Sequence, residues 1–170
     1  RITSKTAENL SSSSGDNTFT IQGSLFNAVA LGDYGNVTVM EVTGNYDAGN
    51  PDGTINDSPR QEIAKEFFKN HPDVYDFLVI FSNFNFAMPE PAAKAFYLEV
   101  KNDTHGIGKL LLDNSAPFGS QGKLQGVIDM GNIETKISDP VNPGFENTIF
   151  LLAHEILHRW GASVRFKEAD

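Results

Sequence analysis

The chain has 170 residues, four histidines, no cysteine and a formal net charge of −9. This length suits one domain with a hydrophobic core, and the lack of cysteine excludes disulfides, thiol nucleophiles and cysteine metal sites. The acidic charge argues against nucleic acid or an anionic membrane as the main partner. No apolar run approaches the roughly 20 residues that cross a bilayer, so no membrane span is expected.

The N-terminal part of the chain predicts a leader followed by short strands. Residues 1–17 are polar and serine-rich, which indicates a flexible leader before a single domain over residues 18–170. Three short β-type runs follow, separated by turn residues. They are Thr18–Gln22, Phe26–Leu31 and Val37–Val42.

The middle of the chain predicts a helix and then a sheet. Ser58 as cap and Pro59 at the first helical position begin a helix over residues 59–70, and His71-Pro72 ends it. Three runs with strand character follow. They are Tyr75–Phe81 (YDFLVIF), which reads as a central buried strand, Ala95–Lys101 (AFYLEVK), which reads as its neighbour, and Leu124–Met130 (LQGVIDM).

A second helix pattern closes the predicted fold. It runs from Phe145 to Trp160, and Gly161 supplies a stop signal. Its apolar side is expected to be buried; it consists of Ile149, Leu152, Ala153, Ile156 and Trp160. We therefore predict an α/β (α+β) domain in which a mixed twisted sheet packs against the helices over 59–70 and 145–160.

The second helix contains the sequence His154-Glu155-Ile156-Leu157-His158, an HExxH pattern. Four residues rise about 6 Å along a helix and make slightly more than one turn, so both imidazoles project from one face. Two such nitrogens can bind one zinc ion at about 2.0–2.1 Å. Glu155 would then act as general base toward a metal-activated water. The simpler interpretation is an amphipathic helix whose histidines fall four apart by chance.

With this motif placed after a sheet, the chain resembles the zincin metallopeptidases. The segments YDFLVIF, NDTHGIG, FGSQGKLQG and HEILHRW are also similar to uncharacterised secreted bacterial zincin-like proteins. The resemblance implies a zincin-like fold and zinc-dependent hydrolysis of peptide bonds, by an endopeptidase rather than an exopeptidase. It further implies a protein or peptide substrate and a secreted or cell-surface location. In that superfamily an edge strand before the active-site helix aligns the substrate, and here LQGVIDM or AFYLEVK is the candidate.

The resemblance leaves the third metal ligand open. Val164 stands where metzincins have their third histidine, and Glu168 and Asp170 follow the motif too closely for the gluzincin glutamate. Three explanations remain: the chain is a fragment whose ligand lies beyond Asp170, an upstream residue such as His105 supplies it, or the site is degenerate. A truncated or degenerate site would make the chain a non-enzymatic structural or binding module.

A second cation is a weaker hypothesis. The loop over residues 45–57 offers oxygen ligands around Gly53, namely Asp47, Asn50, Asp52, Asn56 and Asp57. A calcium loop would also need acids where Ala48 and Pro59 stand, so a plain Asx/Gly turn is the default interpretation. Substrate specificity and oligomeric state stay open at this level.

Overall fold

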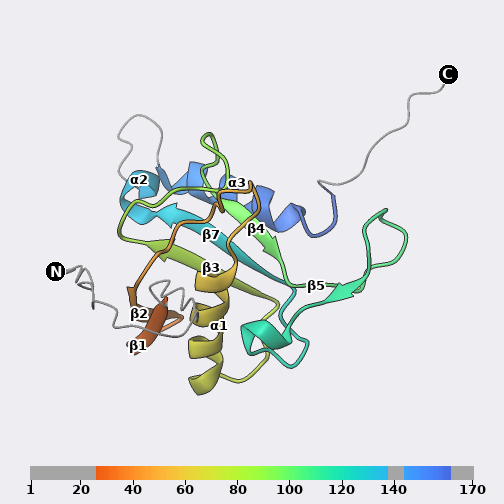
Figure 1. The fold of residues 1–170 in the computed structure, drawn as a ribbon, viewed down its shortest axis with the longest axis horizontal. Helices are drawn as coiled ribbons and strands as arrows, with labels where there is room; N and C mark the ends of the chain where they lie inside the picture. The colour runs from red at the N-terminus through yellow and green to blue at the C-terminus, as the bar shows by residue number, and fades with distance from the viewer. Residues whose placement is uncertain (1–25, 138–143, 162–170) are drawn as a thin grey trace, which may run out of the picture.

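The computed structural model describes residues 26–137 and 144–161 (Figure 1). The predicted leader, the predicted strand Thr18–Gln22 and positions 164, 168 and 170 lie outside the described residues. The described chain is an α+β fold, as the sequence predicts. Its elements are β1 (Asn27–Tyr34), β2 (Val37–Thr43), α1 (Ser58–Asn70), β3 (Phe77–Ser82), β4 (Phe96–Glu99), β5 (Lys101–Asn102), β6 (Leu112–Asp113), a 3₁₀ turn (Ala116–Phe118), β7 (Gly126–Asn132), α2 (Ile133–Ile137) and α3 (Gly144–Leu157).

A mixed three-stranded sheet forms the centre of the fold, in the order β3-β7-β4. The β3 and β7 strands run parallel, with Val79 opposite Ile128, whereas β4 and β7 are antiparallel, with Leu98 opposite Val127. The pairs β1-β2 and β5-β6 form separate antiparallel ribbons. The predicted mixed sheet is therefore confirmed.

The predicted order of the strands is wrong. YDFLVIF forms β3, which lies at one edge, and AFYLEVK forms β4 at the other edge, so the two are not neighbours. The central strand is β7, from LQGVIDM, whose residues Gly126 to Met130 are all buried. Glycine and aspartate make β7 look less apolar than β3, but pairing on both sides determines which strand lies inside.

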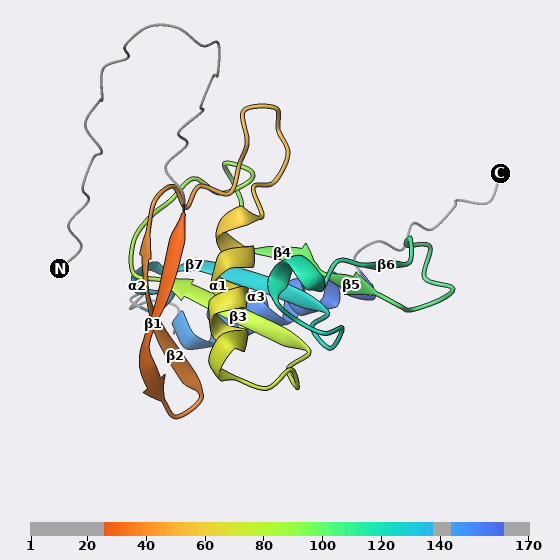
Figure 2. The same ribbon diagram turned by 60° about the horizontal axis from the view of Figure 1, so that its bottom comes forward.

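Helices cover the two faces of the sheet (Figures 1 and 2). Val127 of β7 packs with Ala64 of α1 on one face. Ile128 and Met130 pack with Ile156 of α3 on the other. This alternation follows from the two-residue period of a strand, and it fixes α3 against β7 and β4.

Both helices differ from the prediction at one end. Asp57, rather than Ser58, occupies the N-cap of α1, and no side chain caps the helix. Its end at His71 is confirmed, where the backbone N–H bonds to the carbonyl of Phe67. The α3 helix ends at Leu157 rather than Trp160. Within the described ranges, no helix combines the length and the apolar character needed to cross a bilayer.

A buried ion pair joins α1 to the central strand. The Nε and Nη2 atoms of Arg60 donate to Oδ2 of Asp129 at 3.0 and 2.8 Å, and neither side chain is exposed to solvent. The Tyr46 hydroxyl donates to the same oxygen at 2.7 Å. The backbone N–H of Gly131 donates to the other carboxylate oxygen at 2.9 Å. Such full hydrogen bonding is what a charge needs to be buried.

Candidate metal centre

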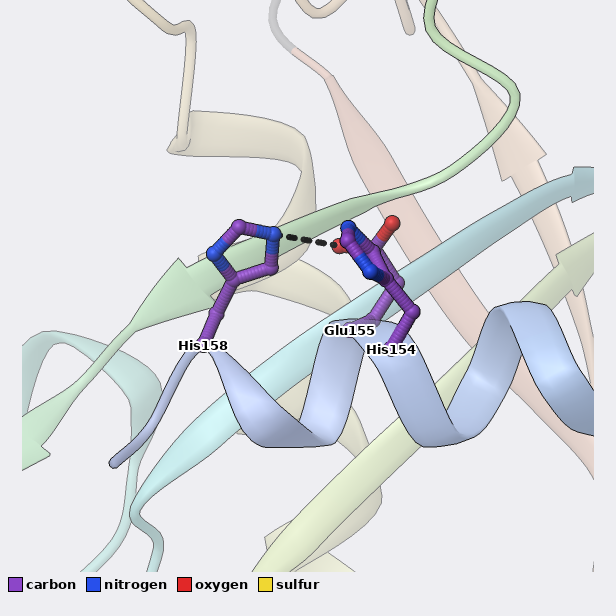
Figure 3. Close-up of side chains that lie close together, drawn as sticks. All are labelled: His154, Glu155 and His158. Carbon is purple, nitrogen blue, oxygen red and sulfur yellow. Dashed lines mark ion pairs between the residues drawn. The ribbon is translucent and has the colours of Figure 1, made fainter. Parts of the chain in front are cut away.

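The HExxH motif forms one compact group at the C-terminal end of α3. One potential ligand atom from each of His154, Glu155 and His158 lies within 4.8 Å of the other two. Figure 3 shows the two imidazoles and the carboxylate projecting from the same stretch of helix. The rings of His154 and His158 are 4.9 Å apart between centroids and nearly perpendicular, at 89°. The predicted convergence of these three side chains is therefore present in the fold.

The face that α3 presents to the sheet is not the predicted one. Leu152 and Ile156 do pack on the core, but Ile149 and Trp160 are 48% and 43% exposed, and Ala153 is also exposed. The buried polar positions of the helix segment are Thr148, Glu155 and Arg159. The orientation of α3 predicted from hydropathy therefore differs from the observed one, which tertiary packing determines.

The helix orientation places Glu155 inside and the histidines nearer to solvent. Glu155 is only 5% exposed, whereas His154 is exposed and His158 is half-buried. Burial raises the pKa of the Glu155 carboxyl, and the nearby His158 and His154 act in the opposite direction. Its Oε2 atom lies 3.8 Å from Nε2 of His158 (Figure 3). A buried carboxyl beside two imidazoles is placed for proton transfer.

The second histidine lies just beyond the α-helix. The N–H groups of His158, Arg159 and Trp160 bond to carbonyls three residues earlier, at 3.1, 3.1 and 3.0 Å. This is the 3₁₀ pattern, in which a helix tightens at its end. The position of His158 therefore does not follow from ideal α-helical spacing alone.

Residues from other elements surround this turn, and the sequence analysis did not single them out. The ring of Tyr97, on β4, is nearly parallel to that of His158, at 11° and 6.4 Å between centroids. The Lys109 ammonium donates to the His158 carbonyl at 3.1 Å. Both residues are distant in sequence from the motif, so spacing gave no sign of them. Arg159 stands directly after the motif, and a buried charge there was not predicted.

The donors present fit part of a zinc site. Imidazole nitrogens suit zinc and several other transition metals, and a catalytic zinc takes three protein ligands. Among the residues that the structure describes, no other histidine, aspartate or glutamate joins the group. His105 is exposed on its loop and lies outside it. The described site thus supplies two imidazoles and a buried carboxylate.

Polar groups of the 45–57 loop bond within the loop and to a neighbouring segment. The Asp52 carboxylate accepts from the N–H and hydroxyl of Thr54 at 3.0 and 2.7 Å. Asp47 accepts from the N–H of Ala87 at 2.8 Å. Gly53 has a φ of 84°, which the tight turn requires. The Asp52 bonds are those of an Asx turn, whereas the Asp47 bond joins the loop to the segment at Ala87. Calcium binding stays a prediction from the sequence.

Comparisons with models of protein families, with curated proteins and with solved structures found no match to this chain. The residues of the metal centre and the resemblance of its motif therefore carry the functional proposal.

Proposed function

We propose that this protein is a zinc-dependent peptidase in which His154 and His158 bind the metal and Glu155 is the general base. The observation that carries the proposal is the grouping of these ligand atoms within 4.8 Å. The burial of Glu155 beside two solvent-accessible imidazoles adds to it. An accidental HExxH pattern on a surface helix would not require its glutamate to be buried.

The chemistry follows from the two kinds of group. A zinc ion held by His154 and His158 would lower the pKa of a bound water to about 7 and polarise a carbonyl. Glu155 takes the proton of the attacking water and delivers it to the leaving amine. Its Oε2 atom lies 3.8 Å from Nε2 of His158, so the proposed base stands beside the proposed ligands.

The edge of the sheet supports a peptide as the substrate. Among the described residues β4 pairs with β7 alone, so an extended chain could add to its other edge. Of the two candidate strands, β7 is paired on both sides and cannot accept another. Tyr97 on β4 lies beside His158. A peptide added to β4 would run past the proposed metal centre, which favours cleavage within a chain. The resemblance to zincins further suggests that the protein is secreted or lies at the cell surface.

A non-enzymatic binding module is the second candidate, and one observation favours it. The described residues contribute two imidazoles but no third protein ligand apart from the proposed base. A site of this kind would bind metal weakly and leave the scaffold to act through its surface.

Elemental analysis together with a cleavage assay separates the two candidates. We expect the purified chain to carry close to one zinc ion and to cleave a denatured protein, with cleavage abolished by a chelator and restored by zinc. A chain that retains no zinc and cleaves nothing would instead support the binding module.

A further inference from the structure

We propose that Arg159 is a positioning residue that holds the last turn of α3, and with it His158, in the place where metal is bound. This inference rests on the proposed function. It starts from the 3₁₀ turn at His158, whose hydrogen bonds are less favourable than those of an α-helix. Contacts from outside the helix must then determine where the second imidazole lies.

Arg159 has side-chain partners on two segments, and one of them, Asn102, is buried. Its Nη1 atom donates to Oδ1 of Asn102 at 2.5 Å, and its Nη2 atom donates to Asp103 and to Oε1 of Gln125, both at 2.8 Å. The guanidinium side chain is only 3% exposed. Hydrogen bonds to a buried charge are stronger than those between neutral groups. These hydrogen bonds therefore hold Arg159 against the end of β5 and against Gln125, which directly precedes β7.

One further contact reaches the same turn, and another links Tyr97 to Gln125. The Lys109 ammonium joins the His158 carbonyl to the Glu99 carboxylate. The Tyr97 hydroxyl donates to the backbone carbonyl of Gln125 at 3.1 Å. Gln125 is thus linked to Arg159 through its side chain and to the ring beside His158 through its backbone. We call the group of residues that holds this turn the bracket. It consists of Arg159, Asn102, Asp103, Gln125 and Lys109.

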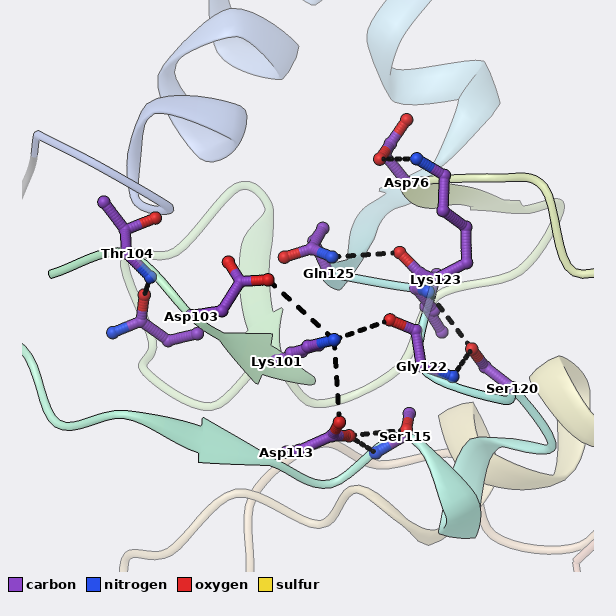
Figure 4. Close-up of polar contacts among 12 residues, drawn as sticks. Asp76, Lys101, Asp103, Thr104, Asp113, Ser115, Ser120, Gly122, Lys123 and Gln125 are labelled. Carbon is purple, nitrogen blue, oxygen red and sulfur yellow. Dashed lines mark hydrogen bonds and ion pairs between the residues drawn. The ribbon is translucent and has the colours of Figure 1, made fainter.

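The neighbouring charges offer a matched control. Lys101 donates to the Gly122 carbonyl at 2.9 Å and lies 3.7 to 3.8 Å from the carboxylates of Asp113 and Asp103. Figure 4 shows its ammonium pointing between these groups, on the same β5–β6 region as the bracket. Within the described ranges Lys101 bonds to no residue of α3, although its partner Asp103 also accepts from Arg159. Its loss tests the general effect of removing a cation from this region.

The experiment compares Arg159→Met, Gln125→Leu, Gln125→Glu and Lys101→Met with the wild type. Zinc affinity is measured by competition with a chelating indicator, and Co²⁺ absorption reports the geometry of the ligands. Backbone hydrogen exchange over residues 151–161 is measured on the metal-free chains. Gln125→Glu keeps the acceptor oxygen that Gln125→Leu removes.

We expect zinc affinity to fall about 10- to 100-fold in Arg159→Met, as when outer partners of metal ligands are lost. Zinc affinity should fall less in Gln125→Leu. It should stay near that of the wild type in Gln125→Glu and Lys101→Met. Exchange should increase at residues 158–161 in Arg159→Met and Gln125→Leu alone. If Arg159→Met fails to fold, the comparison of Gln125→Leu with Gln125→Glu tests the proposal.

Two results would overturn the bracket: unchanged zinc affinity and exchange in both Arg159→Met and Gln125→Leu, or equal losses in Lys101→Met. A wild type that binds no zinc would instead contradict the proposed function. In that case the exchange measurement still decides whether the bracket holds the turn.

Discussion

At the scale of single residues, the candidate metal centre places two solvent-accessible imidazoles beside a buried carboxylate. The i, i+4 spacing indicates that His154 and His158 converge. The 3₁₀ turn beyond Leu157, which sets the position of His158, was not predicted. The burial of Glu155 was not predicted, since it depends on which face of α3 meets the sheet. The partners of Arg159 lie more than 30 residues away in sequence, beyond the reach of any local pattern.

Replacing His158 by alanine tests the ligand pair. We expect His158→Ala to lower zinc affinity by more than about 100-fold, because losing a ligand costs more than losing an outer partner. His105→Ala is the control, since His105 is exposed and outside the group. Competition with a chelating indicator measures both. An equal loss in His105→Ala would show that the upstream histidine binds the metal after all.

At the scale of elements, close packing against β7 positions β4 beside the candidate metal centre. A Cβ atom added at Gly126 would lie 2.2 to 2.6 Å from atoms of the Tyr97 ring. The glycine therefore leaves space for the ring that lies parallel to His158. The identity of residue 126 and the placement of Tyr97 are coupled.

We expect Gly126→Ala to destabilise the fold by about 1–3 kcal/mol, the usual cost of overpacking. In a Tyr97→Leu background the same change should cost clearly less, because the ring is gone. Urea unfolding of the four chains in this double-mutant cycle gives the coupling. Equal costs in the two backgrounds would mean that the ring is not the obstacle.

The elements also show how far local patterns reach. Strand and helix periods predicted the locations of β1, β2, β3, β4, β7, α1 and α3 within a few residues. The order of the strands was wrong, since the most apolar run, β3, lies at an edge. The helix face was wrong as well, because Glu155 and Arg159 are buried while Trp160 is exposed. Pairing and packing between distant segments decide both properties.

At the scale of the whole molecule, polar contacts hold the helices on either side of the sheet. Arg60 and Asp129 join α1 to β7 from one side, and Arg159 joins the end of the α3 segment to Gln125 from the other. The candidate metal centre therefore lies on a sheet that polar contacts hold on both faces. Loss of either contact should lower the free energy of unfolding of the whole domain.

Asp129→Asn should destabilise the protein by about 3–5 kcal/mol, because it leaves the buried Arg60 guanidinium without a counter-charge. Lys65→Ala, which removes an exposed pair with Glu62, should cost no more than about 0.5 kcal/mol. Urea unfolding measures both variants. Similar small costs would show that the buried pair contributes little to the fold.

The most direct test of the central claim compares Glu155→Gln with the wild type, both loaded with zinc, in the cleavage of a denatured protein. The change keeps the shape of the side chain and removes its ability to accept a proton. We predict equal zinc content and a loss of cleavage to background in Glu155→Gln. Undiminished cleavage by Glu155→Gln would contradict the proposed mechanism.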